Sequence, residues 1–187
     1  MSEFPSLKDH FLIAMPNLID LNFYRSVTYI IEHNEEGAMG IVINQPLEAD
    51  LKQLLEHLNI HTKEGFVGNK KLMSGGPVQI ERGFIVHTPY GHWQSSMRLS
   101  QHIAVTTSPD ILTAISENKG PENVEVILGY AGWEAGQLDQ EILQNSWLSV
   151  PANAEVLFHT PVEKRWQAAA ELIGIDITQL TTEAGHC

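Results

Sequence analysis

The chain of 187 residues is 43% hydrophobic and carries a formal net charge of −12 at pH 7, so it can form one compact core over residues 1–187 and it repels a polyanion such as DNA. Its longest early apolar run, residues 11–15, is too short to span a bilayer and lacks the basic leader of a signal peptide, so we expect a cytoplasmic protein without membrane contact. The only cysteine, Cys187, excludes an intrachain disulfide, which is typical of a reducing compartment.

Three strands and a hairpin turn are predicted first. Apolar residues dominate residues 11–15, 27–33 and 38–44, which is typical of β-strands. Residues 34–37, Asn-Glu-Glu-Gly, have the length and the closing glycine of a hairpin turn. We therefore expect the second and third strands to form an antiparallel pair.

A capped helix follows the third strand. Its leucines recur at helical spacing, and Asp50 and Gln53 occupy the two positions of a capping box. Residues 72–77 end in Ser-Gly-Gly-Pro, which indicates a turn or a break in a strand, and residues 83–87 predict another strand. The middle of the chain therefore adds a second unit that resembles a hairpin.

The next segment leads into a second helix. Residues 91–100 are polar and irregular, and residues 102–107 return to a strand pattern. Ser108 is followed by proline and an acidic residue, which is the order found at helix N-termini. We therefore interpret Ser108 as the cap of a helix over residues 109–118.

A central strand, a glycine-rich turn and a helix are predicted next. Residues 124–128 form a near-continuous β-rich run, which is typical of a strand buried on both faces. Residues 129–136 alternate glycines with aromatic residues, which indicates a tight packed turn, and residues 136–143 predict a helix. The glycine spacing matches neither a dinucleotide loop nor a P-loop, and Glu134 would repel a phosphate at the helix N-terminus, so we expect no cofactor there.

Two short strands and a last helix close the chain. The strands are predicted over residues 147–150 and 156–158, and the helix over residues 161–173, where Gly174 ends it. Strand pairs separated by single helices, without a regular βαβ rhythm, favour an α+β fold with helices packed outside an irregular sheet.

Few residues have the setting of a catalytic or metal-binding group. His57 and His61 have the four-residue spacing of zinc proteases, but leucine stands where those enzymes place the catalytic glutamate, so we expect no metal. His33 and His87 end two strands and are candidate general bases. No nucleophile is paired with either by sequence, so we favour structural hydrogen bonds for both.

Several separated motifs resemble one bacterial family. They occur at residues 11–16, 37–44, 75–78, 83–87 and 129–138. Their order over nearly the whole length resembles the YqgE/AlgH family. The resemblance implies an α+β domain whose bifurcated mixed β-sheet curls into a pseudo-barrel with flanking helices. It implies no catalytic or ligand residues, although some members carry the label of a transcriptional regulator without a recognised DNA-binding motif.

The leading hypothesis is a non-enzymatic accessory or regulatory protein that binds a protein partner or a small molecule. Its candidate binding surface is built from residues in turns and at strand ends, where function tends to sit on a rigid scaffold. These residues are Asn44, Ser74, Gly75, Gly76, His87, Trp133 and Gln137. They do not supply the acid, base and nucleophile that an enzyme needs.

An enzyme of another class is the first alternative. It would use His33 or His87 as its base, with backbone N–H groups of the glycine turns stabilising an oxyanion. A pocket that joins one of these histidines to Asp20, Ser74 or Asp110 would favour it.

A regulator that binds DNA directly is the second alternative. Binding to DNA requires a basic patch that neutralises several phosphates. The candidates for a local patch are Lys70, Lys71 and Arg82, and the net charge of the chain disfavours this function.

Overall fold

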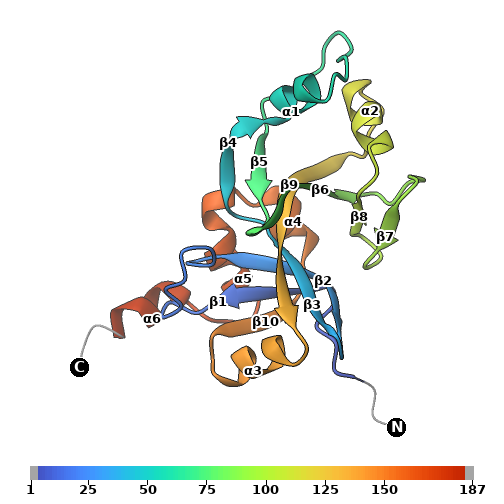
Figure 1. Ribbon diagram of the computed structural model, residues 1–187. Helices are drawn as coiled ribbons and strands as arrows, with labels where there is room; N and C mark the ends of the chain where they lie inside the picture. The colour runs from blue at the N-terminus through green and yellow to red at the C-terminus, as the bar shows by residue number, and fades with distance from the viewer. Residues whose placement is uncertain (1–3, 184–187) are drawn as a thin grey trace.

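The computed structural model describes residues 4–183, which fold into a strongly curled sheet, a half-barrel, with helices packed around it (Figure 1). The strands are β1 (His10–Ala14), β2 (Val27–Asn34), β3 (Gly37–Val42), β4 (Pro46–Asp50), β5 (Lys71–Ser74), β6 (Val78–Thr88), β7 (Ser96–Arg98), β8 (Ala104–Thr106), β9 (Asn123–Glu134) and β10 (Trp147–Pro151). The helices are α1 (Leu51–His57), α2 (Asp110–Ser116), α3 (Gln137–Leu143), α4 (Ala154–His159), the 3-10 helix η1 (Val162–Lys164), α5 (Arg165–Glu171) and α6 (Ile177–Glu183). The fold is α+β, as predicted.

The strand β9 divides the sheet into two branches. The order of the strands is β10-β1-β2-β3-β9-β6-β8-β7, and β5, which also pairs with β4, runs parallel to β9. Residues 123–128 of β9 pair with residues 83–88 of β6, whereas residues 131–134 pair with residues 37–40 of β3. One strand therefore serves both branches, which confirms the predicted bifurcated mixed sheet.

Gly129 stands between the two halves of β9, at a position that requires glycine. Its φ of 82° lies in the left-handed region, and a Cβ there would lie 2.7 Å from the carbonyl oxygen of Gly76. A Cβ on Gly75 would lie 2.2 Å from the carbonyl oxygen of Gly129. The predicted Ser-Gly-Gly-Pro turn thus packs backbone against backbone on β9, where no side chain fits.

The glycine-rich segment is not the turn that its composition predicts. The strand β9 continues to Glu134, and the turn begins only at Ala135, just before α3. Gly132 has no positive φ, and a Cβ there would meet no atom closer than 3.9 Å. Burial alternates with a period of two from Gly129 to Glu134, as in a strand, and Gly129 and Gly132 fall on opposite faces.

Residues 156–158 are not a strand, because they lie in α4. The side chain of Asn153 caps this helix, since its Oδ1 accepts a hydrogen bond from the Val156 N–H at 3.0 Å. Three apolar residues are too few for their period to distinguish a strand from a helix.

Other local predictions also need correction. Ser108 does not cap α2, because its hydroxyl donates to Oδ1 of Asp110 and its oxygen accepts from the Ser95 N–H. The strands β4 and β7 and the helix α6 were not predicted, since their sequences show no clear apolar period. No helix among residues 4–183 is long and apolar enough to cross a membrane, and Cys187 lies outside this range.

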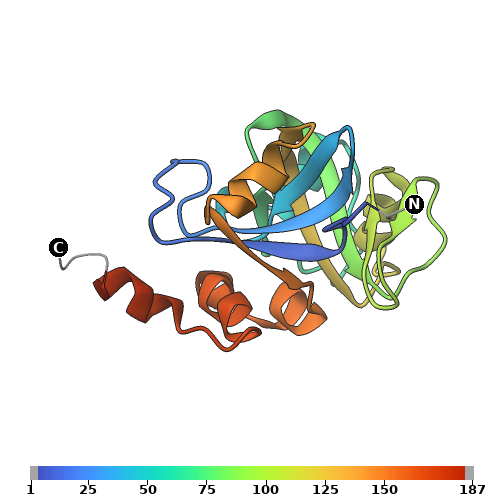
Figure 2. The ribbon, with the colours of Figure 1, turned by 90° about the horizontal axis from the view of Figure 1, so that it is seen from below.

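Helices cover both faces of the β1–β2 ribbon (Figure 2). Figure 2 shows α4, α5 and α6 along one side and α3 on the other. The side chains of β1 alternate accordingly: Phe11 packs in the cluster that contains Trp166 of α5, whereas its neighbour Leu12 packs with Leu138 of α3. A third cluster joins α1 and α2 to β5, β6 and β9, so each branch of the sheet has its own helical cover.

Candidate functional site

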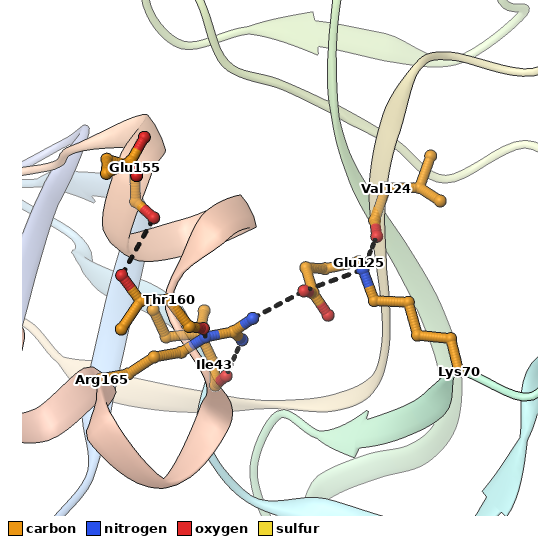
Figure 3. A network of polar contacts seen from close by, with 7 residues as sticks. All are labelled: Ile43, Lys70, Val124, Glu125, Glu155, Thr160 and Arg165. Atoms are coloured by element: carbon orange, nitrogen blue, oxygen red, sulfur yellow. Dashed lines mark hydrogen bonds and ion pairs between the residues drawn. The ribbon is translucent and has the colours of Figure 1, made fainter.

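Glu125, on β9, is a buried carboxylate paired with two cations. Its Oε1 lies 2.7 Å from Nη2 of Arg165 and 3.1 Å from Nζ of Lys70 (Figure 3). The side chains of Glu125 and Arg165 are 1% and 3% exposed, whereas that of Lys70 is 47% exposed. Because a charge inside a protein is tolerated only when it is paired and hydrogen-bonded, these contacts fix β9, the start of α5 and the residue before β5 together.

Arg165 ties the helical layer to the sheet. Its Nη1 donates to the carbonyl of Ile43 at 2.6 Å, and its Nε donates to the carbonyl of Thr160 at 3.0 Å. Thr160 in turn donates from its hydroxyl to the carbonyl of Glu155 in α4 at 3.1 Å (Figure 3). The guanidinium therefore connects the segment after β3, the strand β9 and the loop after α4.

Lys70 completes the network on the side of the solvent. Its Nζ donates to the carbonyl of Val124 at 2.5 Å as well as facing Glu125. An ammonium has three N–H donors, so one donor of Lys70 has no partner within residues 4–183. The half-exposed side chain can direct this donor toward a ligand.

The network lines a cleft of about 660 Å³ between β5, β9 and the segment from α4 to α5. A cleft of this size suits a small-molecule ligand. The second carboxylate oxygen of Glu125, Oε2, is buried and accepts no hydrogen bond within the described part of the chain, and it carries no dashed line in Figure 3. Buried polar atoms are nearly always hydrogen-bonded, so this oxygen is an unmet acceptor, and it is closed to solvent although Glu125 lines the cleft.

The residues that line the cleft carry a net positive charge, whereas the whole chain carries a net negative charge. Lys70, Lys71 and Arg165 line the cleft together with Glu125 and Glu163, which amounts to a formal charge of +1 with histidine counted as neutral. The whole chain carries −12. Clefts whose walls carry one excess sign of charge concentrate ions of the opposite sign, so this cleft attracts anions.

Four of the predicted binding residues lie at the junction of β3, β5 and β9. Asn44 accepts from the Val27 N–H at 2.8 Å through Oδ1 and donates to the carbonyl of Arg25 at 2.9 Å through Nδ2. Residues 74–76 form the backbone contact with β9, and the carbonyl of Gly75 also accepts from the N–H of Val42. These groups therefore hold the branch point of the sheet, and none of the four residues lines the cleft.

Trp133 and Gln137 lie together at the other end of β9. Trp133 is 7% exposed and donates from Nε1 to Oε2 of Glu141 at 2.7 Å. Gln137 accepts from the Glu134 N–H at 3.0 Å and donates to Oε1 of Glu141 at 3.3 Å. Both side chains attach α3 to the sheet, at the opposite end of β9 from Asn123.

His87 is fully buried among hydrogen-bond partners. Its Nδ1 lies 3.0 Å from the carbonyl of Pro89, and its Nε2 lies 2.7 Å from Oγ1 of Thr106. Because a carbonyl only accepts, Nδ1 carries the proton and Nε2 accepts from Thr106. Burial lowers the pKa of His87, against the raising effect of its bond to Pro89, so the ring is neutral at pH 7.

His33 lies far from His87. Its Nδ1 accepts from the Leu7 N–H at 2.9 Å, and its Nε2 lies 3.4 Å from Oδ1 of Asp139 on α3. His33 lies opposite Ala38 of β3, which lies opposite Trp133 near the end of β9. His87 lies opposite Val124, near the start of β9. The two histidines therefore do not face each other, and within residues 4–183 neither hydrogen-bonds to the partners that a catalytic pocket would need: Asp20, Ser74 or Asp110.

His57 and His61 do not share a helical face. His57 is the last residue of α1, and His61 lies in the loop beyond it. Among the residues that the structure describes, no group of three His, Cys, Asp or Glu side chains could hold a metal ion.

The three candidates for a basic patch are divided between two sites. Lys70 and Lys71 line the charged cleft, whereas the guanidinium of Arg82 stacks over the rings of Phe84 and Tyr130, 5.1 and 5.7 Å from their centres. They therefore do not form one surface for phosphates.

The sequence did not predict the network of Glu125, Arg165 and Lys70, although it named Lys70 as a candidate for a basic patch. A signal for Glu125 existed: it interrupts the apolar run Val-Glu-Val-Ile-Leu of a strand predicted to be buried on both faces, where a carboxylate requires a cation. No local signal identifies Arg165 or Lys70 as its partners, because they lie 40 and 55 residues away along the chain.

Comparison with known proteins gives consistent results. The family model described as AlgH-like matches residues 11–178. The chain is 52% identical over 186 residues to a UPF0301 protein of Thioalkalivibrio sulfidiphilus, with 100% of both chains covered. It is 50% identical over 179 residues to a UPF0301 protein of Nitrosococcus oceani, with 96% of both covered.

Two solved structures share the fold. The solution structure of the AlgH protein from Pseudomonas aeruginosa matches with a TM-score of 0.79 and 45% identity, covering 100% of this chain and 99% of that one. The crystal structure of protein DIP2367 from Corynebacterium diphtheriae matches with a TM-score of 0.76 and 19% identity, covering 97% and 94%, and supports the fold alone. From its motifs, its half-barrel and these relatives, the chain belongs to the AlgH-like family, as its sequence predicts.

Proposed function

We propose that the protein is a non-enzymatic accessory or regulatory protein that binds a small molecule in the charged cleft. One observation carries this proposal: a cleft of about 660 Å³ is lined by Lys70 and Lys71, whose ammonium groups keep N–H donors without a partner within the described residues. A ligand that accepts hydrogen bonds from such an ammonium group gains a charge-assisted contact in the cleft. Binding of a protein partner remains a prediction, and we assign no surface of the protein to it.

The cleft favours binding over catalysis. Arg165 and Glu125 neutralise each other, and Arg165 is held by further hydrogen bonds to the carbonyls of Ile43 and Thr160. The imidazole of His87 bonds to Pro89 and Thr106 instead. His159 and Thr160 also line the cleft, but the Thr160 hydroxyl donates to the carbonyl of Glu155. Among the described residues the cleft thus offers charge and hydrogen bonds without a nucleophile and a base hydrogen-bonded to each other.

The position of the cleft supports regulation by its ligand. The sheet forms one wall through β5 and β9, and the segment from α4 to α5 forms the other. A ligand that contacts both walls stabilises the packing of this segment on the sheet, because it binds only the packed state. Ligand binding in the cleft would therefore alter the packing of α4 and α5, and this change would be detectable at their surface.

The test is to identify a molecule that copurifies with the protein. Untagged protein is desalted and denatured, and the released small molecules are quantified by mass spectrometry. Wild type and the control Lys119→Ala, which removes an exposed lysine after α2, should release the same compound, whereas Lys70→Ala should have lost it. Equal release from Lys70→Ala would place the ligand elsewhere. The proposal fails if wild type releases nothing and a cytosolic metabolite extract does not raise its melting temperature.

A further inference from the structure

We infer that the protein has a second ligand site, a pocket between the two branches of the sheet that binds a small apolar molecule ending in a carboxylate. Arg82 binds the carboxylate, and the apolar part of the molecule lies against side chains from both branches. The pocket has a volume of about 290 Å³. It shares no lining residue with the charged cleft, so this inference is independent of the proposed function.

The wall of the pocket is largely apolar. Strands β2 and β3 supply it from the branch that pairs with the end of β9, and β6, β7 and β8 supply it from the other branch (Figure 1). Its apolar side chains are Ile31, Met39, Phe84, Met97 and Val105. Three of them belong to the main core, whereas Met39 is partly buried and Met97 is 40% exposed. Because methionine side chains are flexible, these two can adapt to the shape of an apolar ligand.

Arg82 is the one cation among the described residues that line this pocket. Its guanidinium lies 5.1 Å from the centre of the Phe84 ring, which also lines the pocket, and 5.7 Å from that of Tyr130. Packing on two rings holds the guanidinium in place. Within residues 4–183 it has neither a hydrogen-bond acceptor nor a carboxylate at ion-pair distance. The N–H donors of a guanidinium form a planar fork that matches a carboxylate, so a carboxylate is the group that this side chain would bind.

Glu32 also lines the pocket, but its carboxylate is directed elsewhere. Its Oε1 lies 3.5 Å from Nδ2 of Asn34, and Asn34 lines a neighbouring hollow but not this pocket. Glu32 and Arg82 form no ion pair in the described part of the chain. The charge of Arg82 therefore remains free to attract an anionic ligand.

The volume of the pocket sets the size of the apolar part of the ligand. An apolar cavity of about 150 Å³ binds benzene, and this pocket has about twice that volume. Apolar walls with a few placed polar groups are typical of small-molecule sites. One ring with a short chain and a terminal carboxylate therefore fits, and hydrocinnamate is a probe of this form.

Calorimetric titration of the full-length protein with three matched probes tests the inference. Hydrocinnamate is compared with hydrocinnamyl alcohol, which lacks the charge, and with acetate, which lacks the apolar part. We expect hydrocinnamate to bind at least tenfold more tightly than either. Equal affinities of hydrocinnamate and the alcohol would overturn the role of Arg82, and equal affinities of hydrocinnamate and acetate would overturn the role of the apolar wall. Absence of binding at millimolar hydrocinnamate would overturn the whole inference.

A matched pair of variants tests the contribution of the guanidinium. Arg82→Met keeps an unbranched side chain, so it should bind hydrocinnamate no more tightly than the alcohol. Arg98→Met is the control, because Arg98 is also exposed and lies 5.6 Å from the centre of the Tyr90 ring but does not line the pocket. It should bind hydrocinnamate like wild type. An equal loss of binding in both variants would overturn the assignment to Arg82.

Methionine methyl signals of the wild-type protein locate the ligand without any variant. Met39 and Met97 line this pocket, whereas Met73 lines the charged cleft. Titration with hydrocinnamate should shift the methyl signals of Met39 and Met97 and leave that of Met73 unchanged. A shift of the Met73 signal alone would place the ligand in the charged cleft and overturn the second site, while leaving the proposed function intact.

Discussion

Trp133 of β9 donates a hydrogen bond of 2.7 Å from its indole Nε1 to Oε2 of Glu141 on α3. Trp147 of β10 donates to the same oxygen at 3.2 Å, and the two indoles pack edge to face with their centres 6.2 Å apart. The strand that divides the sheet and the strand at its edge are therefore attached to α3 through one carboxylate. This carboxylate satisfies both indole donors in the core cluster that contains Leu12 and Leu138.

Trp133→Ala should lower the free energy of unfolding by about 3–5 kcal/mol, because it removes a large buried ring. Trp133→Phe keeps a ring but leaves Glu141 with one indole donor, so it should cost less, about 1–3 kcal/mol. Urea unfolding of both variants measures the difference. An unchanged midpoint for Trp133→Ala would show that the ring is not buried in solution.

Gly129→Ala should destabilise the fold much more than Gly132→Ala. Gly129 has a left-handed φ and a carbonyl oxygen 2.7 Å from the place of a Cβ, so alanine should cost more than about 2 kcal/mol. Gly132 has open space and no positive φ, so alanine there should change stability by less than about 1 kcal/mol. The comparison is made by thermal or urea unfolding. The reverse order would restore the interpretation of residues 129–136 as a turn.

Stability should fall in acid because of His87. Burial lowers its folded pKa below the ordinary value of 6.5, so between the two values the unfolded state binds more protons than the folded state. The contribution of neutral His87 to the free energy of unfolding is fully present above about pH 6.5 and is lost as the pH falls toward the pKa of the folded state. Urea unfolding from pH 8 to pH 5 should show a smaller pH slope in His87→Asn than in wild type. His102→Asn, at an exposed position, is the control, and an unchanged slope in His87→Asn would contradict the prediction.

Signals that lie within a few residues predicted the local structure correctly. Asp50 and Gln53 form the predicted capping box, with bonds of 2.9 Å in both directions. The hairpin of β2 and β3 is also confirmed. Both features depend on side chains and backbone groups only a few positions apart, so the local sequence contains the cause.

Long-range packing explains what the sequence did not show. Gly129 must be glycine because Gly76, 53 residues earlier in the chain, lies against it. Composition alone predicted a turn over residues 129–136, where the structure has a continuous strand up to Glu134. The cleft likewise joins Lys70, Glu125 and Arg165 from three distant segments. The buried carboxylate was the one local sign of that site, since it stands in an apolar strand without a neighbouring cation.

The protein should not bind duplex DNA specifically, even if its deletion alters transcription. Lys70 is engaged with Glu125, and Arg82 lies over two aromatic rings away from the cleft, so the described part of the chain does not combine them into a phosphate-binding surface. The net charge of −12 adds general repulsion. A titration with promoter DNA at about 150 mM salt, where charges are screened beyond roughly 8 Å, measures this. Sequence-specific affinity tighter than micromolar, lost when Lys70, Lys71 and Arg82 are all replaced by alanine, would instead establish direct regulation and make the cleft an electrostatic site for DNA.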